Sequence, residues 1–529
     1  MWVSDFAPTT VEATTAYNWR CFLAAKGGRN ESKRWQLAFR DCAAICLIAM
    51  LLAVSAGLSS AHAETKLQKL STDTFTNSYS EHRTEVEPHT YAYGSTIVSA
   101  FEVARWFNGG GADIGFATST DAGKTWQHGY LPGLTQNYKG GSYYTASDPV
   151  VAYDAKHAVW LINYVPITTN EDSVDVGVSS STDGIHWSNP VLVDQSGVDD
   201  KNWITCDNSS SSPYYGNCYV EWDLGFSTGQ IQMSTSSDGG KTWGAAKGTA
   251  DQAGGIGGQP VVQPNGTVVV PIEAGIGISA FTSTNGGKSW NSLVSVSSID
   301  YWGEEGGLRS GPLPSARVDG AGKVYVVWGD CRFRNGCTAN DIVMSTSTNG
   351  TKWSSVTRIP IDPTKSTVDH FLPGLGVDRA TSGKTAHLAM TYYYYPVSQC
   401  GNSCKLEVGF TVSHDGGNTW TAGRHLAGPM GLSWIAPSDN GQMVGDYIGV
   451  DFANGQPFGV FAVAKPPGGK LNEAMYTTNA PLSVSRGEPR FSSNGDQRVA
   501  ARRWVRKFYD DDGQRPIPPS EQKPPLRGR

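Results

Sequence analysis

The sequence predicts an all-β fold, because one short turn phrase recurs six times, each copy ends a strand-like stretch, and glycine and aromatic residues are abundant. The chain has 529 residues with 62 Gly, 17 Trp and 22 Tyr and only 17% charged residues, so turn and strand formers dominate over helix-favouring charge. Turns repeated at intervals of about 47 to 66 residues indicate blades arranged radially. We therefore predict a seven-bladed β-propeller, with six blades as the alternative.

The repeated phrase is clearest at residues 236–243, where Ser-Ser-Asp-Gly-Gly-Lys-Thr-Trp follows the alternating stretch 231–235. Asp-Gly or Asn-Gly supplies the positive φ angle of a tight hairpin, and the Asp or Asn side chain can accept hydrogen bonds from turn amides. The Trp can fold back over the hairpin. The other copies occupy residues 119–126, 181–187, 283–290, 347–353 and 413–420.

These phrases resemble the Asp-box, or BNR, repeats of the sialidase superfamily of β-propellers, and the resemblance covers about residues 80–480. In that superfamily the box is a structural turn between the third and fourth strands of a blade, on the face opposite the active site. The resemblance therefore implies a structural role for the Asp of each box. Sialidases have six blades, and their Arg-Ile-Pro motif is absent before the first box, where Glu87-Pro88-His89 stands.

Each box belongs to a longer unit whose first, inner strand begins near a proline or a charged residue. The units open at residues 87–89, 148–149, 200–203, 259–260, 313–314, 370–373 and 445–447. The seventh unit ends at residues 474–478 without a box and lacks a fourth strand. We expect residues 67–75 to supply that strand and to close the ring.

The two ends of the chain differ in composition from the propeller, which we place at residues 64–482. Basic residues, an apolar run at 42–54 and Ala61-His62-Ala63 have the order of a secretory signal peptide, so we predict that residues 1–63 are an extension cleaved after Ala63. The apolar run is short for a membrane span, and we expect none in the mature, secreted or periplasmic protein. Residues 483–529, rich in Arg, Lys, Asp and Pro, are predicted to be a disordered tail.

The cysteines agree with export. Three of the nine, Cys21, Cys42 and Cys46, precede the predicted cleavage point. The other six are neighbours in pairs, which on a secreted chain predicts disulfides rather than a metal site, because C-x-x-C spacing and nearby His are missing. The predicted disulfides are Cys206–Cys218, Cys331–Cys337 and Cys400–Cys404.

Polar residues cluster at the starts of the predicted inner strands, which in a propeller surround one mouth of the central channel. We assign catalytic roles there to Asp148, Glu305, Tyr447, Asp446 and His370. The residues expected to bind substrate are Glu87, His89, Arg105, Asp200, Lys201, Gln259, Arg309 and Arg332. Such a mouth suits an acidic oligo- or polysaccharide, because aromatic faces stack on sugars and Arg binds carboxylates in a bidentate manner.

These residues predict a sialidase-like glycoside hydrolase, which needs an acid for the leaving oxygen and a nucleophile or base opposite it. Asp148 is the predicted acid/base. The resemblance implies a Tyr nucleophile backed by Glu, for which Tyr447 or Tyr301 and Glu304 or Glu305 are available.

Two alternatives stay open. A polysaccharide lyase on uronate-containing glycans would use His370, His89 or Tyr447 as base, with Arg309 on the carboxylate. A non-catalytic propeller that binds glycan or protein would use the same mouth without turnover. A formal net charge of −6 without a basic stripe argues against a nucleic-acid partner. We expect a monomer without cofactor or metal.

Overall fold

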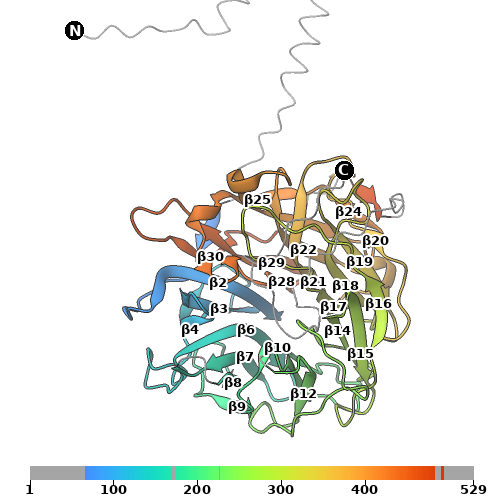
Figure 1. Ribbon diagram of the computed structural model, residues 1–529. Helices are drawn as coiled ribbons and strands as arrows, with labels where there is room; N and C mark the ends of the chain where they lie inside the picture. The colour runs from blue at the N-terminus through green and yellow to red at the C-terminus, as the bar shows by residue number, and fades with distance from the viewer. Residues whose placement is uncertain (1–65, 170–172, 226, 483–489, 494–529) are drawn as a thin grey trace, which may run out of the picture. The chain divides into compact units, whose positions relative to one another are not determined.

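The computed structural model describes residues 66–169, 173–225, 227–482 and 490–493, where strands and turns predominate and short 3-10 helices occur at Gly383–Thr385, Gly401–Ser403 and Leu432–Trp434. All of these residues belong to one of the two compact units of the chain, residues 65–529. Its strands are arranged around a centre as in a propeller (Figure 1), which confirms the all-β propeller prediction. The predicted signal peptide, residues 1–63, with its cleavage point lies outside the described residues.

The sheets follow one another along the chain. The first contains β2 (Ser80–Tyr93), β3 (Thr96–Trp106), β4 (Gly111–Ser119), β5 (Gln127–Tyr130), β6 (Thr145–Asp154), β7 (Val159–Ile167), β8 (Val176–Ser181) and β9 (Val191–Asp194). A three-stranded sheet contains β10 (Asp200–Cys206), β11 (Cys218–Asp223) and β12 (Ile231–Ser236). The next contains β13 (Val261–Val262), β14 (Val268–Ala274), β15 (Gly277–Ser283) and β16 (Val294–Ser298).

Three further four-stranded sheets and two two-stranded ladders complete the compact unit of residues 65–529. One contains β17 (Ser315–Val318), β18 (Val324–Asp330), β19 (Asp341–Ser347) and β20 (Thr357–Arg358). One contains β21 (Asp369–Val377), β22 (Leu388–Tyr395), β23 (Lys405–Ser413) and β25 (Arg424–Gly431). The last contains β28 (Gly449–Ala453), β29 (Gln456–Ala464), β30 (Glu473–Thr478) and β1 (Leu67–Lys69). The small ladders pair β24 (Thr419–Thr421) with β31 (Arg490–Ser492) and β26 (Pro437–Ser438) with β27 (Gly441–Gln442).

The number of blades differs from the prediction. The inner strands contact one another in the order β2, β6, β10, β13, β17, β21 and β28, with β28 next to β2. However, Gly111 of β4 pairs with Ala146 of β6, which joins the first two units into one eight-stranded sheet, and the sheet of β10 has three strands. Counted as sheets of four or more strands, the ring has five blades. The prediction of seven, and the alternative of six, is therefore wrong.

The ring is closed by the segment that precedes β2. Strand β1 pairs antiparallel with β30, with Leu67 opposite Thr478. Leu70, the residue after β1, is 2% exposed and packs into the core. Its N–H donates to the Met475 carbonyl at 2.8 Å. The prediction that residues 67–75 supply the missing strand is confirmed for Leu67–Lys69, whereas residues 70–75 form no strand.

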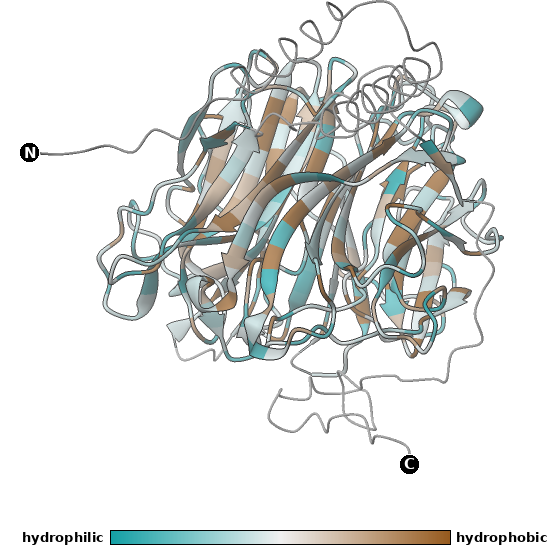
Figure 2. Ribbon diagram, turned by 90° about the horizontal axis from the view of Figure 1, so that it is seen from above, coloured by the Kyte–Doolittle hydropathy of each residue, from teal (hydrophilic) through white to brown (hydrophobic). Residues whose placement is uncertain are grey.

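Hydrophobic residues fill the spaces between neighbouring sheets. Figure 2 shows hydrophobic stretches along the strands, in keeping with their alternation in the sequence. One cluster brings Val98 and Ile114 of the first unit together with Trp160 and Ile162 of the second. Since each sheet buries both faces against its neighbours, the inner strands are held in fixed register around the channel.

The six repeated turns share one hydrogen-bonding arrangement. In the first, Asp121 Oδ1 accepts the N–H groups of Lys124 (3.1 Å) and Thr125 (2.9 Å), and the Thr125 hydroxyl donates to Oδ2 (2.7 Å). The Ser119 hydroxyl donates to Asp121 (2.9 Å) and accepts the Gly123 N–H (2.8 Å). The corresponding acceptors of the other turns are Asp183, Asp238, Asn285, Asn349 and Asp415. These side chains hold the turns together, as a structural role requires.

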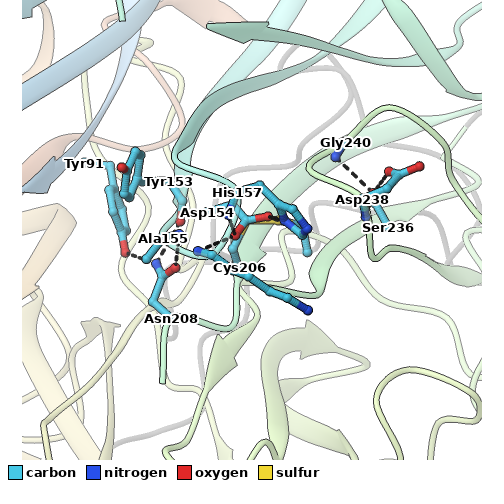
Figure 3. The surroundings of a disulfide bond; sticks show 12 residues. Tyr91, Tyr153, Asp154, Ala155, His157, Cys206, Asn208, Ser236, Asp238 and Gly240 are labelled. Carbon is cyan, nitrogen blue, oxygen red and sulfur yellow. Dashed lines mark hydrogen bonds and ion pairs between the residues drawn. A yellow bond between two sulfur atoms is a disulfide. The ribbon is translucent and has the colours of Figure 1, made fainter. Parts of the chain in front are cut away.

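The turn glycines fasten one unit to the unit before it. Gly240 has a φ of 80°, and a Cβ added there would lie 2.8 Å from Leu161 Cδ2 on β7. A Cβ added to Gly239 would lie 3.1 Å from His157 Cβ, in the turn between β6 and β7. Figure 3 draws His157 together with Ser236, Asp238 and Gly240 of the same repeated turn. Only glycine combines this backbone angle with so close an approach.

All three predicted disulfides are confirmed: Cys206–Cys218, Cys331–Cys337 and Cys400–Cys404. The first joins residues paired across β10 and β11, where the Cα atoms are 4.0 Å apart. Disulfides are consistent with an extracellular protein. In the part of the chain that the structure describes, no helix has the length and apolar character to cross a membrane.

Part of the predicted disordered tail is ordered. Strand β31 pairs with β24, and Phe491 lies opposite Trp420, the residue that ends the sixth repeated turn. The Ser493 hydroxyl donates to the carbonyls of Gly417 (3.1 Å) and Asn418 (3.0 Å). The composition of the tail does not indicate this strand, because the strand has only three residues and all of them are exposed. Residues 483–489 and 494–529 lie outside the described residues.

Candidate functional site

Four inner strands carry the same distortion near their starts. β2, β6, β10 and β21 each lose one step of register against the next strand. Within these bulges Glu87, Asp148, Lys201 and Leu372 have φ angles of 57°, 52°, 47° and 47°. A bulge redirects a side chain, and a non-glycine residue at positive φ is strained, a combination that is concentrated at functional sites. Here it brings three charged side chains together at one end of the channel.

Lys201 lies at the centre of this group. Its Nζ is 2.9 Å from Asp148 Oδ1 and 3.6 Å from Glu87 Oε1, and it also hydrogen-bonds to Asp446 Oδ2. The side chain is only 9% exposed. Burial alone would lower the pKa of Lys201, but the carboxylates of Asp148, Asp446 and Glu87 raise it well above its ordinary value. The ammonium group therefore stays charged.

Asp446, just before β28, is held by two cations. Arg309 donates from Nε to Oδ1 (2.9 Å) and from Nη2 to Oδ2 (2.5 Å), the bidentate geometry of a strong ion pair. Burial would raise the pKa of Asp446, but Arg309 and Lys201 outweigh burial and hold it below its usual range. Its backbone N–H donates to Glu87 Oε1 at 3.1 Å. Asp446 is thus an ionised, fixed carboxylate.

A second carboxyl pair adjoins the first. Asp200 and Asp223 are opposite each other on β10 and β11, and a Cβ added to Gly225 would lie 3.0 Å from Asp200 Oδ2 and 2.9 Å from Asp223 Oδ1. Burial, and then the charge of Asp148, raises the pKa of Asp200 to about 6 against the opposing effect of Lys201. Burial and the neighbouring Asp200 raise the pKa of Asp223 well above its ordinary value.

These residues form one group, which we call the Lys201 cluster. Its members are Glu87, Asp148, Asp200, Lys201, Asp223, Arg309 and Asp446. Burial, and then Asp148, raises the pKa of Glu87 well above its ordinary value, against the opposing effect of Lys201. Carboxyl groups with pKa values pushed apart are the equipment of acid/base chemistry.

The cluster borders a cavity of about 20 Å³, whose lining includes Asp148, Lys201, Trp203, Gln259, Asp446 and Tyr447. This volume holds a single water molecule. A sugar would therefore meet the cluster at its outer edge, where the Arg309 side chain is 22% exposed and Asp200 is partly exposed.

Tyr447 belongs to the mouth but is not placed as a nucleophile. Its hydroxyl donates to the Pro149 carbonyl at 3.1 Å, and its ring packs edge-on against Trp203. Burial, with the charges of Glu87 and Asp148, raises the pKa of Tyr447 well above its ordinary value. The phenol therefore stays protonated and fixes the backbone of the Asp148 bulge.

Two predicted site residues, Glu305 and Arg332, lie outside the Lys201 cluster. Glu305 accepts the Gly401 N–H at 2.6 Å, beside the Cys400–Cys404 disulfide. Arg332 forms a bidentate pair with Asp330 on its own strand-end loop. These positions are corrections: Glu305 bonds to the loop between β22 and β23, and Arg332 bonds to the end of its own strand β18, instead of joining the Lys201 cluster.

Arg105 and Gln259 support the mouth from behind. Arg105 pairs with Glu102 at 2.8 Å and is 1% exposed, so it is not available to a substrate carboxylate. Glu102 in turn accepts the Ser147 hydroxyl at 2.6 Å, next to Asp148. Gln259 lines the cavity, and its Oε1 accepts the Ala316 N–H at 3.0 Å.

His370 joins a buried network away from the Lys201 cluster. His370 lies close enough to Asp341 and Asp362 for the three side chains to hold a metal ion together. However, Arg334 already pairs with Asp341 (2.6 Å) and Asp362 (2.9 Å), and Arg358 pairs with the same two carboxylates (2.9 and 2.8 Å). Two guanidinium groups in contact with both carboxylates make this set a poor cation site. The other candidate set, Glu305 with Cys400 and Cys404, does not suit a metal because the thiols form a disulfide.

Several functional residues were not predicted from the sequence. Asp223 adds a carboxyl group next to Asp200. Glu102 accepts the Ser147 hydroxyl beside Asp148, and Trp203 lines the cavity. Glu102 and Asp223 lie on second strands and reach the mouth through cross-strand register. A signal that could have found Asp223 is its position at the end of a strand that pairs with the Asp200 start.

No protein-family profile and no curated protein matches the sequence. Among solved structures, a leech intramolecular trans-sialidase is similar at 12% identity over 64% of this chain and 70% of that chain, with a TM-score of 0.42. A Hadza microbial sialidase is similar at 14% identity over 76% and 66%, with a TM-score of 0.42. A Podospora anserina α-L-arabinofuranosidase is similar at 12% identity over 66% and 96%, with a TM-score of 0.34.

Proposed function

We propose that the chain is a glycoside hydrolase that cleaves a glycan at the outer edge of the Lys201 cluster. The observation that carries the proposal is the partly exposed carboxyl of Asp200, whose pKa is raised to about 6, beside the Asp148 carboxylate that Lys201 holds. Hydrolysis of a glycoside needs one protonated and one ionised carboxyl group. Asp200 supplies the first and Asp148 the second.

In this proposal Asp200 protonates the leaving glycosidic oxygen, and Asp148 acts as the base or nucleophile on the other side of the sugar. The sequence alone favoured Asp148 as acid/base, and its bond to Lys201 now favours the ionised role. Lys201 and Arg309 keep Asp446 and Asp148 in place. A general acid of this kind contributes about 10²- to 10⁴-fold to the rate.

The charge of the glycan stays a prediction. An acidic sugar would use Arg309, whose Nε and Nη2 already bind Asp446. A substrate carboxylate would therefore meet the remaining nitrogen, Nη1. Acidic and neutral glycans must be compared directly.

The lyase alternative has less support. Its proposed bases are His370, which lies in the Arg334–Arg358 network, and Tyr447, whose hydroxyl is engaged by Pro149. His89 is a neutral base, because burial and the nearby Arg317 lower its pKa well below the ordinary value, but it lies deeper in the channel. A propeller that only binds glycan would show no turnover with any substrate.

A substrate screen tests the proposal. Acidic and neutral oligosaccharides are incubated with the protein, and new reducing ends and the ultraviolet absorbance of unsaturated uronates are read together. We expect new reducing ends without absorbance, and a loss of about 10²- to 10⁴-fold in Asp200→Asn and Asp148→Asn. Asp238→Asn, in a repeated turn, is the matched control and should keep full turnover. Wild-type turnover in both Asp200→Asn and Asp148→Asn would disprove the assignment.

We also propose that the six turns are Asp boxes of the sialidase superfamily and that the chain is exported with cleavage after Ala63. The shared turn hydrogen bonds support the first point, and three disulfides support the second. N-terminal sequencing of the exported protein should begin at Glu64. Retention of the apolar run 42–54 in that protein would contradict the prediction.

A further inference from the structure

A recess of about 370 Å³ lies at the other end of the channel from the Lys201 cluster. Its lining comes from the ends of inner strands and the loops after them, including His89, Tyr91, Trp203, Asn208, Arg317 and Arg379. Trp203 also borders the small mouth cavity, so it separates the two spaces. The volume is that of a small-molecule site.

The hydrogen bonds of His89 leave donors facing each other. The Val151 backbone N–H points to His89 Nδ1 at 3.0 Å, and because an amide can only donate, Nδ1 is the acceptor. The neutral ring therefore carries its proton on Nε2. That nitrogen lies 3.2 Å from Arg317 Nη2, which is also a donor. The two groups cannot bond to each other, and both need the same kind of partner.

Arg317 has a second unsatisfied donor on the same edge. Its Nη1 donates to the Ala316 carbonyl at 2.8 Å, but its buried Nε has no partner among the described residues. Arg309 and Arg332 use this Nε and Nη2 edge to grip the carboxylates of Asp446 and Asp330. In Arg317 the equivalent edge faces His89 instead of a carboxylate.

The remaining charges around the recess are already engaged. Arg379 donates to Asp451 Oδ2 at 2.8 Å and stacks on the Tyr91 ring, with its guanidinium carbon 4.2 Å from the ring centre. Asp319 accepts four hydrogen bonds within its own turn and from Gly383. Among the charged side chains described in the lining, Arg317 therefore has a donor without an acceptor, beside His89 Nε2.

The walls of the recess favour an organic ligand. Trp203, Val261 and Val262 form an apolar side. On the opposite side, the Asn208 amide donates to the Tyr91 hydroxyl (3.3 Å) and the Tyr153 carbonyl (2.7 Å), as Figure 3 shows. Asn208 lies two residues after Cys206 of a disulfide, so this side is fixed before a ligand arrives.

We propose that this recess binds the carboxylate of a small organic molecule. One oxygen accepts from His89 Nε2–H and Arg317 Nη2, and the other from Arg317 Nε, while the organic part lies on the Trp203 wall. The site is separate from the proposed hydrolase site, and its occupation needs no turnover.

Calorimetric titration of the full chain with sodium acetate and sodium glucuronate tests this site, with methyl glucoside as the uncharged probe and phosphate as the inorganic one. We expect the carboxylates to bind, at concentrations up to about 50 mM, which detects a millimolar Kd. Arg317→Lys keeps the positive charge but loses the two parallel N–H donors of the guanidinium group, and Arg317→Gln loses the charge as well. Each variant should weaken binding about tenfold or more. Lys241→Gln, on an exposed lysine of a repeated turn, is the control and should leave the affinity unchanged.

Nitrogen NMR of labelled histidine gives a second readout, because a carboxylate at His89 should shift the signal of Nε2 in the wild-type chain and not in Arg317→Gln. Circular dichroism checks that each variant is folded. Carboxylate binding that is absent in the wild type, or that is as tight in both Arg317 variants as in the wild type, would overturn the proposal. Phosphate bound as tightly as glucuronate would overturn the assignment to an organic carboxylate.

Discussion

At the scale of single residues, Lys201 stabilises the carboxyl groups gathered at the channel mouth. Three carboxylates surround its ammonium group, and a buried charge whose partner is removed is costly. Lys201→Met should therefore lower the free energy of unfolding by about 3–5 kcal/mol, measured by denaturant titration. Lys241→Met, on an exposed lysine of a repeated turn, is the control and should change it by about 0.5 kcal/mol or less. Similar losses in both variants would contradict the role of Lys201.

Asp200 should set the pH dependence of turnover. Since burial raises its pKa to about 6, the proton required for catalysis is lost above that pH, and the rate should fall about tenfold per pH unit. A rate profile measured with the substrate from the screen checks this, and a flat profile above pH 6 would contradict it. The same shift means that folding binds the proton more tightly. The stabilisation is complete below the unfolded-state pKa and is lost as pH rises through about 6.

At the scale of elements, the repeated turn is expected to contribute to the stability of the fold and not to catalysis. Asp238 accepts hydrogen bonds from Lys241 N (3.1 Å), Thr242 N (3.0 Å) and the Thr242 and Ser236 hydroxyls. Asp238→Ala should lower the free energy of unfolding by about 1–3 kcal/mol, because turn donors lose their acceptor. Thermal unfolding measures this loss, with Lys241→Ala as the control in the same turn. Unchanged stability in Asp238→Ala would argue against a structural carboxylate.

The inner-strand bulges explain what the sequence could and could not predict about the site. Glu87 and Asp148 each precede a proline, and both lie in inner-strand bulges with positive φ angles. In β21 the bulged residue is Leu372, so the redirected side chain is apolar and His370, two residues earlier, points to another network. Sequence shows where an inner strand starts, but it does not show which residue the bulge turns inward.

Loops and cross-strand pairs were the harder part of the prediction. Glu305 and Arg332 were placed at the mouth because their loops lie on that face, yet each binds a near neighbour instead. Asp223 was missed because its closeness to Asp200 depends on the register of β10 against β11. The predicted number of blades was wrong for a related reason: the pair of Gly111 with Ala146 merges two units, the sheet of β10 has only three strands, and neither feature has a sequence signature.

At the scale of the whole molecule, stability depends on closing the ring. Leu70 is 2% exposed and joins the core of the last sheet from the opposite end of the chain. Leu70→Ala should lower the free energy of unfolding by about 2–5 kcal/mol. Denaturant unfolding measures the loss, and Val397→Ala, at a side chain that is 50% exposed, should change it little. A Leu70→Ala protein as stable as the wild type would mean that the ring does not need this contact.

Because the first and last strands of the ring pair with each other, the order of its sheets has no natural beginning. The Asn479 N–H donates to the Lys66 carbonyl at 3.0 Å, so a short peptide could join these two points. The chain could then be opened in the turn between β14 and β15, where Ile276 is 59% exposed. Such a circularly permuted protein should fold to the same arrangement, because insertions and new termini are tolerated best at exposed loop tips. Folding of the ring would then not depend on which of its turns is opened.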